Sequence, residues 1–308
     1  MARLRLAVTL GDPRGIGAEI VRKALADERV RAAAELLVVG PTGLGGHVDE
    51  VVGEWHAGGG SVASAGRLSG LAIERAVALA RSAAVQGIVT APIDKHALLA
   101  GGYDYPGHTE MLAALCGTPT TMMLASDRLR VALATTHIPL RDVAAAVTED
   151  VLRDTAHRTR HALRDYFRIA EPRIALCALN PHAGDGGRFG DEDDRVLAPA
   201  ARDAGLAGPF PADTVFVRAI RGEFDAVIAP YHDVGMTAIK VASFGHAVNV
   251  TLGLPFPRTS PDHGTAMDIA GQDSADPSSM IEAILLCASL AERLTSAGRD
   301  KGSVTRRS

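Results

Sequence analysis

Three histidines of this 308-residue chain share one local context. Each follows an apolar segment typical of a β-strand: VALATTH ends at His137, IALCALNPH at His182 and AVIAPYH at His232. Because ligands of open α/β sheets bind outside the carboxyl ends of the strands, we expect these imidazoles to converge. Three imidazoles with one open position can hold a catalytic metal ion, which polarises an alcohol or carbonyl oxygen. The alternative is three separate hydrogen-bonded histidines, and the matched contexts favour the metal site.

Acidic residues accompany two of these histidines. Asp233 directly follows His232 and can hold that imidazole in its metal-binding tautomer. Asp191 and Glu192 follow His182 and open a predicted helix, where acidic side chains can simply complement the helix dipole. The sequence therefore assigns a supporting role to Asp233 and leaves both readings open for the other two acids.

A second group of polar residues suits an anion. The segment GHTE, residues 107–110, opens a predicted helix, whose backbone amides and dipole favour a bound phosphate or other anion. Lys240, Asn249 and Arg258 add cationic and amide donors for a phosphate or carboxylate. Taken singly, Thr109 can be only a helix cap, and Lys240 or Arg258 can be only a solvated surface charge.

Residues 247–271, AVNVTLGLPFPRTSPDHGTAMDIAG, place a dense polar loop after a short strand-like run. Loops mounted on a strand in this way commonly carry binding residues. The alternative is a solvated loop followed by a helix, with Thr265 or Asp268 near its cap. Residues 11–17, GDPRGIG, also follow a strand, but they match neither G-x-G-x-x-G nor a Walker motif.

The elements that must position these residues alternate between strand and helix. Strands are predicted at residues 4–10, 36–39, 88–91, 121–124, 129–135, 173–178 and 226–229. Helices are predicted at residues 17–25, 69–85 with Ser69 as the cap, 107–115, 148–167, 191–204, 214–221 and 280–294, with a flexible glycine-rich loop at 53–60. This alternation predicts an α/β fold with a largely parallel sheet, in two lobes that the chain crosses between more than once.

Composition excludes several classes of protein. Aromatic residues make up 4% of the chain and its net charge is −4, so a nucleic-acid partner is not indicated. Three distant cysteines, Cys116, Cys177 and Cys287, form no CxxC pair, which argues against a disulfide framework or a zinc ribbon. No apolar run reaches the length of a signal peptide or a membrane span, so we expect a cytoplasmic protein.

Together the motifs resemble those of the 4-hydroxythreonine-4-phosphate dehydrogenases, the PdxA family of pyridoxal phosphate biosynthesis. The resemblance covers nearly the whole chain except its tail. Its motifs are GDPRGIGAEI from Gly11, TAPIDK from Thr90, GHTE from Gly107, THIPL from Thr136, LNPHAGDGG from Leu179, PADT from Pro211, YHDVGM from Tyr231 and VNVTLGLPFPRTSPDHGTAMDIAG from Val248.

The resemblance implies a two-lobed fold similar to the isocitrate and isopropylmalate dehydrogenases. Residues 1–130 with 250–308 then form the lobe of the cofactor loop, and residues 131–249 form the lobe of metal binding and dimerisation. It implies a homodimer with the active site in the interdomain cleft, completed by the neighbouring subunit. It also implies NAD or NADP as cofactor and a divalent ion, zinc, magnesium or cobalt.

The resemblance assigns a role to each candidate residue. The metal ligands are His137, His182 and His232. The substrate-binding residues are His108, Thr109, Lys240, Asn249 and Arg258. The cofactor loop, which resembles the HGSAPDIAG-like loop of the isocitrate-type enzymes, binds through His263, Gly264, Thr265 and Asp268. Lys240 also has a catalytic role, and Asp213 orients the substrate amine or a metal-bound water.

The implied reaction oxidises 4-phosphohydroxy-L-threonine to a 3-keto acid that decarboxylates to 3-amino-2-oxopropyl phosphate. The chain departs from many members of the family at Arg14, Ala18, Val234 and Met236. Alternatives are therefore a paralogue acting on 4-phospho-D-threonate, 4-phospho-erythronate or an aromatic cis-dihydrodiol such as that of terephthalate. Other classes are a catalytically silent binding protein and a metal-dependent hydrolase, which has no need of the cofactor loop.

Overall fold

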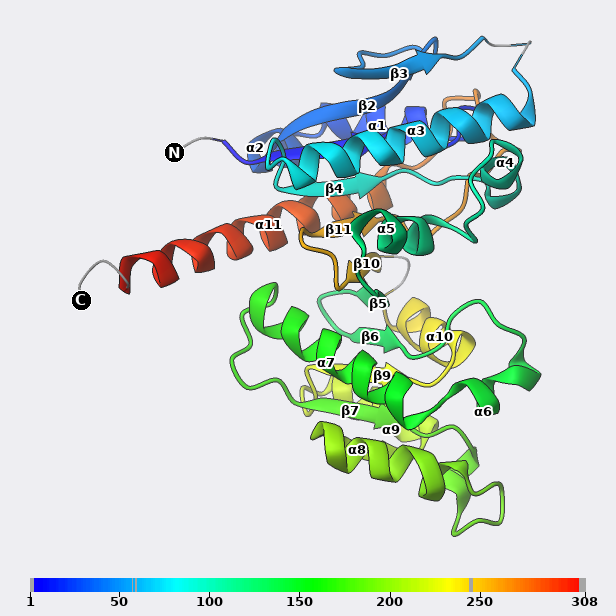
Figure 1. The fold of residues 1–308 in the computed structure, drawn as a ribbon, viewed down its shortest axis with the longest axis vertical. Coiled ribbons are helices and arrows are strands. Elements are labelled where there is room, and N and C mark those ends of the chain that lie inside the picture. The colour runs from blue at the N-terminus through cyan, green and yellow to red at the C-terminus, as the bar shows by residue number, and fades with distance from the viewer. Residues whose placement is uncertain (1–2, 57, 59, 244–245, 305–308) are drawn as a thin grey trace. The chain divides into compact units, whose positions relative to one another are not determined.

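The computed structural model describes residues 3–56, 58, 60–243 and 246–304, with side chains up to residue 296 (Figure 1). The chain divides into two compact units: unit 1 comprises residues 1–120 and 248–308, and unit 2 comprises residues 121–247. The sequence placed the first crossing near residue 130, whereas the strand that starts at Thr121 pairs within unit 2. Among the described residues, no helix is both long and apolar enough to span a membrane.

Unit 1 is built on a mostly parallel sheet. Its strands are β1 (Arg5–Thr9), β2 (Glu35–Thr42), β3 (Glu50–Glu54), β4 (Gly87–Thr90), β10 (Val248–Leu252) and β11 (Arg258–Ser260). They lie in the order β3-β2-β1-β4-β11-β10, and only β10 runs antiparallel to its neighbour β11. The central strands β1 and β4 are almost wholly buried, as expected of parallel strands covered on both faces.

Helices cover both faces of this sheet. They are α1 (Gly17–Ala26), α2 (Glu28–Ala33), α3 (Val62–Arg81), α4 (Lys95–Ala100), α5 (His108–Cys116) and α11 (Ser278–Val304). Helix α3 packs on β1 and β2 and against α4 and α5, while α1, α2 and α11 pack together on the other face (Figure 1). The core between α3 and the sheet is aliphatic, with Ile73, Val77 and Ile88 fully or almost fully buried.

Unit 2 contains the other five strands of the described chain. Its strands are β5 (Thr121–Ala125), β6 (Arg130–Leu133), β7 (Ile174–Cys177), β8 (Ala207–Phe210) and β9 (Ala226–Ala229). They lie in the order β5-β6-β9-β7-β8, with β5 antiparallel and the other strands parallel to one another. Since β6, β9 and β7 are parallel neighbours, the segments that follow them leave the same edge of the sheet.

Helices also cover unit 2 on both faces. They are α6 (Val143–Ala146), α7 (Glu149–Asp165), α8 (Ala198–Ala204), α9 (Ala212–Ile220) and α10 (His232–Ser243), with short turns η1 (Leu140–Asp142), η2 (Pro181–Gly184) and η3 (Asp193–Leu197). Helices α7 and α8 pack together, and α10 packs on β6 and β9. The predicted α/β fold with a largely parallel sheet is confirmed.

Three local predictions are wrong. Ser69 does not cap α3, whose capping residue is Ser61. Ser69 lies inside the helix, where its hydroxyl donates to the Ala65 carbonyl. The predicted loop at 53–60 overlaps the end of β3, which includes Gly53 and Glu54, and the amide of Trp55 just beyond it donates to the Thr42 carbonyl (residues 57 and 59 lie outside the described part). No helix starts at Thr265 or Asp268 within the described chain, where turns continue to Ser278.

Candidate active site

The most deeply buried cation of the described chain is Arg258, at the start of β11 in unit 1. Its side chain is 1% exposed, and its Nη atoms donate to the hydroxyls of Thr251 (2.9 Å) and Thr90. Burial lowers the pKa of Arg258 to about 10, so the guanidinium remains charged at neutral pH. Its Nε is buried without a hydrogen-bond partner among the described residues. Such a group is costly unless an anion completes its contacts.

Two further predicted residues have the same property. The Nε2 atom of His108, in the first turn of α5, and the Oδ1 atom of Asn249, on β10, are buried without partners in the described chain. Asn249 and Thr251 are two residues apart and therefore lie on the same face of β10. Arg258 donates to Thr251 from the neighbouring strand. The sequence prediction thus selected three side chains with unsatisfied buried polar atoms.

The charge around His108 is consistent with a site for an anion. Burial lowers the pKa of His108 well below 6.5, and the positive charges of Arg258 and Lys95 lower it further. The imidazole is therefore neutral at pH 7. The capping residue of α5 is Gly107, which has no side chain to satisfy the first amides, so the helix N-terminus stays open to a ligand, with Thr109 in its first turn.

Lys95 is a candidate that the sequence analysis missed. It starts α4, and its Cε lies 3.6 Å from the position that a Cβ on Gly107 would occupy. Its ammonium group therefore adds positive charge to the N-terminus of α5. The signal was present in the sequence, because TAPIDK follows the strand β4 at its carboxyl end.

The GDPRGIG turn and the predicted cofactor loop pack together. The amide of Ile16 donates to the Thr265 carbonyl (3.0 Å), and a Cβ on Gly15 would lie 2.7 Å from that same oxygen. Only glycine therefore allows this approach. Beside it, Arg14 binds the buried carboxylate of Asp12 through two hydrogen bonds of 3.0 and 2.7 Å. Arg14, where the chain departs from many family members, thus adds a cation whose charge is neutralised by Asp12 of the same turn.

The remaining residues of the cofactor loop are more exposed. The Nδ1 atom of His263 lies 3.0 Å from the Gly264 carbonyl oxygen, and the Asp268 carbonyl accepts a hydrogen bond from Gln272. Nothing lies within 4 Å of the position that a Cβ on Gly264 would occupy, so this part of the loop is open to a ligand.

In unit 2, each predicted metal ligand follows one of the neighbouring strands β6, β9 and β7. The rings of His137 and His232 lie 5.5 Å apart between centroids. The buried hydroxyl of Thr135 donates to the Pro230 carbonyl (2.7 Å), which fixes the two strand ends to each other. The Nδ1 atom of His232 lies 2.7 Å from the Asp233 carboxylate, the contact expected for a ligand whose Nε2 faces a metal ion.

His182 stands on a turn with an unusual backbone. His182, Ala183 and Asp185 all have positive φ, at 54°, 55° and 45°, a conformation that favours glycine. Its ring lies 6.3 Å from that of Phe189. Among the described residues, no three histidine, cysteine or acidic side chains lie close enough together to hold a metal ion. The structure therefore brings two of the three predicted ligands together and places the third on a separate strained turn.

A carboxylate brace precedes that turn. Asp193 is fully buried, and its two oxygens accept hydrogen bonds from the amides of Leu179 (2.8 Å) and Asn180 (2.9 Å). Glu192 accepts a hydrogen bond from the Asn180 side-chain amide (2.8 Å). Glu192 is thus more than a helix-dipole acid, and Asp193 was missed because the run DEDD gives no sign of which acid is buried.

The two residues with predicted catalytic roles lie elsewhere in unit 2. Asp213 is exposed in the first turn of α9. Lys240 is exposed on α10, about two helical turns beyond His232. Val234 and Met236, two of the departures, pack against the hydrophobic core beneath α10.

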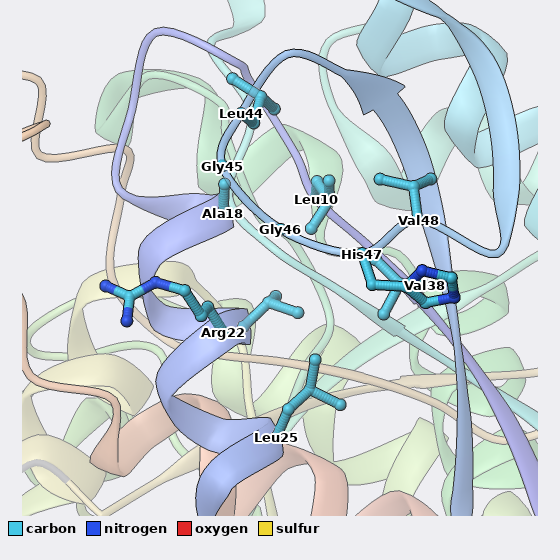
Figure 2. Close-up of a pocket in the computed structure, with 11 residues that line it drawn as sticks. Leu10, Ala18, Arg22, Leu25, Val38, Leu44, Gly45, Gly46, His47 and Val48 are labelled. Atoms are coloured by element: carbon cyan, nitrogen blue, oxygen red, sulfur yellow. The ribbon is translucent and has the colours of Figure 1, made fainter.

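A small pocket in unit 1 is separate from these residues. It lies between α1 and β2, has a volume of about 40 Å³ and is lined mainly by apolar side chains, with Arg22 and His47 at its rim (Figure 2). Ala18, another departure, lines it. This volume holds about one water molecule, so the pocket is too small for a substrate.

Comparison with known proteins identifies the family of the chain. The model of the family "Pyridoxal phosphate biosynthetic protein PdxA" matches residues 22–287. D-threonate 4-phosphate dehydrogenase of Cupriavidus necator is 42% identical over 94% of this chain and 97% of its own length. 4-Hydroxythreonine-4-phosphate dehydrogenase of Geobacter metallireducens is 41% identical over 96% of this chain and 97% of its own length.

Solved structures agree as well. The crystal structure of 4-hydroxythreonine-4-phosphate dehydrogenase from Klebsiella pneumoniae has a TM-score of 0.84 at 38% identity, covering 94% of this chain and 98% of its own. Isocitrate dehydrogenase from Methylococcus capsulatus, at 14% identity and a TM-score of 0.51 over 98% of this chain and 89% of its own, shares the fold alone, which confirms the predicted fold type. The expected family is confirmed: the chain belongs to the PdxA family of pyridoxal phosphate biosynthetic proteins.

Proposed function

We propose that this protein is an NAD(P)- and divalent-metal-dependent dehydrogenase acting on 4-phosphohydroxy-L-threonine. The substrate loses the hydride of its secondary alcohol to the nicotinamide and the hydroxyl proton to solvent. The resulting 3-keto acid loses carbon dioxide, and protonation of the α-carbon by a proton from solvent then gives 3-amino-2-oxopropyl phosphate. One observation carries the proposal: unit 1 holds a buried guanidinium, imidazole and amide with unsatisfied polar atoms, all at positions that the family assigns to the substrate.

The substrate phosphate binds at the N-terminus of α5. The open amides of the first turn and the Thr109 hydroxyl donate to its oxygens, and the neutral imidazole of His108 donates one further N–H. Arg258 and Lys95 supply the positive charge. Because Arg258 is already fixed by Thr90 and Thr251, little side-chain entropy is lost on binding.

The imidazoles of His137, His182 and His232 would hold the divalent ion. The ion supplies Lewis-acid polarisation of the substrate hydroxyl when bound. Asp233 accepts the Nδ1 proton of His232 and so leaves Nε2 as the ligand atom, and Asp193 holds the backbone that leads into the His182 turn. In the same proposal Asp213 orients the substrate amine and Lys240 binds the substrate and assists the reaction.

The cofactor binds along the loop of His263, Gly264, Thr265 and Asp268. The tether from Ile16 to the Thr265 carbonyl fixes this loop to the start of α1, and the open space beside Gly264 lets a ligand approach the backbone. The proposal includes a cytoplasmic homodimer whose neighbouring subunit completes the active site. Light scattering coupled to size-exclusion chromatography measures the mass of the protein in solution and tests the dimer. A monomeric mass contradicts the proposed dimer and leaves the proposed reaction untouched.

A second candidate substrate is 4-phospho-D-threonate. It is favoured by the 42% identity to a D-threonate 4-phosphate dehydrogenase over nearly the whole chain. The same phosphate site and metal ligands serve both compounds, which differ in the group beside the carboxylate. The Val234 and Met236 departures lie on α10 next to His232, so they are the first positions to exchange if the threonate is preferred.

The test is formation of NADH with each phosphorylated compound and its phosphate-free analogue, with and without a chelator. We expect chelator-sensitive turnover of 4-phosphohydroxy-threonine and negligible turnover of 4-hydroxythreonine. Restoration of activity by added zinc, magnesium or cobalt identifies the ion, and NADP in place of NAD identifies the cofactor. Turnover of 4-phospho-D-threonate alone would change the assigned substrate to that compound. If the protein binds neither NAD nor NADP, the proposed dehydrogenase activity is contradicted.

A further inference from the structure

Helix α7 carries a pair of histidines outside all the residues assigned to the reaction. His157 and His161 are four residues apart in the sequence, and their rings lie 4.4 Å apart between centroids. Both side chains are exposed. Two histidines at positions i and i+4 project from the same face of a helix, which is the spacing with which helical histidine pairs bind zinc.

The helix holds this pair in a fixed geometry. Thr148 caps α7 through its hydroxyl, which accepts from the amide of Val151, and acidic residues occupy the first turn. The opposite face is buried, with Leu152, Ala156 and Leu163 in the core of unit 2. A helix packed in this way does not fray at its centre, so the two imidazoles remain one turn apart without a bound ligand.

The two arginines between the histidines point to other partners. The Nε atom of Arg158 donates to the Thr121 hydroxyl (2.7 Å), and Arg160 donates to the Gly205 carbonyl (2.9 Å). Their guanidinium groups are thereby held on either side of the helix, away from the exposed histidine face. The positive charges nearest in sequence therefore do not occupy the space between the imidazoles.

We propose that His157 and His161 form a second metal site, which binds a divalent transition-metal ion such as Zn²⁺ through the two imidazoles. No third protein ligand lies within reach among the described residues, so water completes the coordination. Imidazole donors select Zn²⁺, Ni²⁺ or Cu²⁺ over Mg²⁺ or Ca²⁺, which prefer oxygen ligands. By bridging one turn of α7, the ion stabilises the folded form of unit 2.

The test is equilibrium binding of Zn²⁺ to the full-length protein after metal removal, with wild type compared with His157→Ala and His161→Ala. Two ligands fixed on one rigid helix act as a chelate, so losing either weakens this class of site by about 10²–10⁴-fold. We therefore expect each variant to bind one Zn²⁺ fewer per chain than wild type at micromolar free metal. His96 is an exposed histidine outside this pair, so His96→Ala is a matched control that should bind as much Zn²⁺ as wild type does.

A second experiment distinguishes loss of the metal site from a general effect of the substitutions on the protein. His161→Cys keeps a zinc-binding donor at the same spacing and is expected to restore the lost ion, because thiolate is a strong zinc ligand. Zinc should also raise the Tm of wild type more than that of His157→Ala. Equal zinc binding by wild type and both alanine variants overturns the proposal, as does an equal loss with His96→Ala. Neither result depends on the proposed reaction, because α7 carries none of its residues.

Discussion

The two units hold their candidate binding residues in opposite ways. In unit 1, Arg258, Asn249 and His108 present buried polar atoms that lack partners among the described residues. In unit 2, the predicted metal ligands follow strand ends near the surface and depend on carboxylates, with Asp233 beside His232 and Asp193 behind the His182 turn. A buried cation attracts an anionic ligand without a change of conformation. Histidines near the surface, in contrast, reach their binding geometry only when the metal ion binds.

The largest expected effect tests the histidines of unit 2. His232→Ala should lose the bound divalent ion and reduce kcat/KM on the order of 10³-fold, about 4 kcal/mol of transition-state stabilisation. Metal analysis of the purified variant and steady-state kinetics measure the two quantities. His96→Ala serves as the exposed-histidine control. Retained metal and full turnover would show that unit 2 does not hold the ion through these side chains.

The next effect tests the buried cation of unit 1. Arg258→Lys keeps the charge but loses the fork of donors, so KM for the phosphorylated substrate should rise by about 10–100-fold, while kcat changes less. The phosphate-free analogue should show no such difference between variant and wild type. Arg5→Lys, a half-exposed arginine at the start of β1, is the matched control. A fall in kcat with unchanged KM would place Arg258 at the reacting carbon instead of the phosphate.

A smaller effect tests the brace behind His182. Asp193→Asn replaces one of the two acceptors of the Leu179 and Asn180 amides by a donor, so metal affinity should fall by about 10–100-fold as the turn loosens. Asp194→Asn changes the exposed neighbouring acid and should leave the affinity unchanged. Metal titration gives both values. An equal effect in the two variants would indicate a general loss of negative charge and remove the special role of Asp193.

The smallest effect concerns the dependence of stability on pH. Because the folded pKa of His108 lies well below its unfolded value, the folded protein binds fewer protons, and this group's contribution is present above pH 6.5 and is lost as the pH falls below it. The limit for one such group is about 1.4 kcal/mol per pH unit. Urea unfolding between pH 7.5 and pH 5 should show a shallower loss for His108→Asn than for wild type, and the same slope in both would contradict the buried neutral imidazole. His96→Asn is the control.

The sequence predicted the features that depend on local pattern and failed on those that depend on partners. Apolar and polar patterning located most strands and the majority of the helices, but it missed β3, β8, β11, α2, α4, α6 and α10. Histidines after strands pointed to the edge where β6, β9 and β7 end together. Ser69 was misplaced because a serine inside a helix can satisfy its hydroxyl on the preceding turn, as it does on Ala65. Asp193 was missed because burial, unlike residue type, is decided by contacts distant in the chain.

The division of the chain also has a consequence for the order in which the sites are completed during synthesis. Unit 2 is one uninterrupted stretch, residues 121–247, whereas unit 1 also requires residues 248–308, which are synthesised after unit 2. Strand β11, which carries Arg258, pairs with the much earlier β4. On the ribosome, unit 2 and its histidines can therefore fold before Arg258, the guanidinium of the proposed anion site, has been synthesised. A nascent chain released at residue 247 contains every proposed metal ligand and lacks Arg258, the residue proposed to select the substrate by its charge.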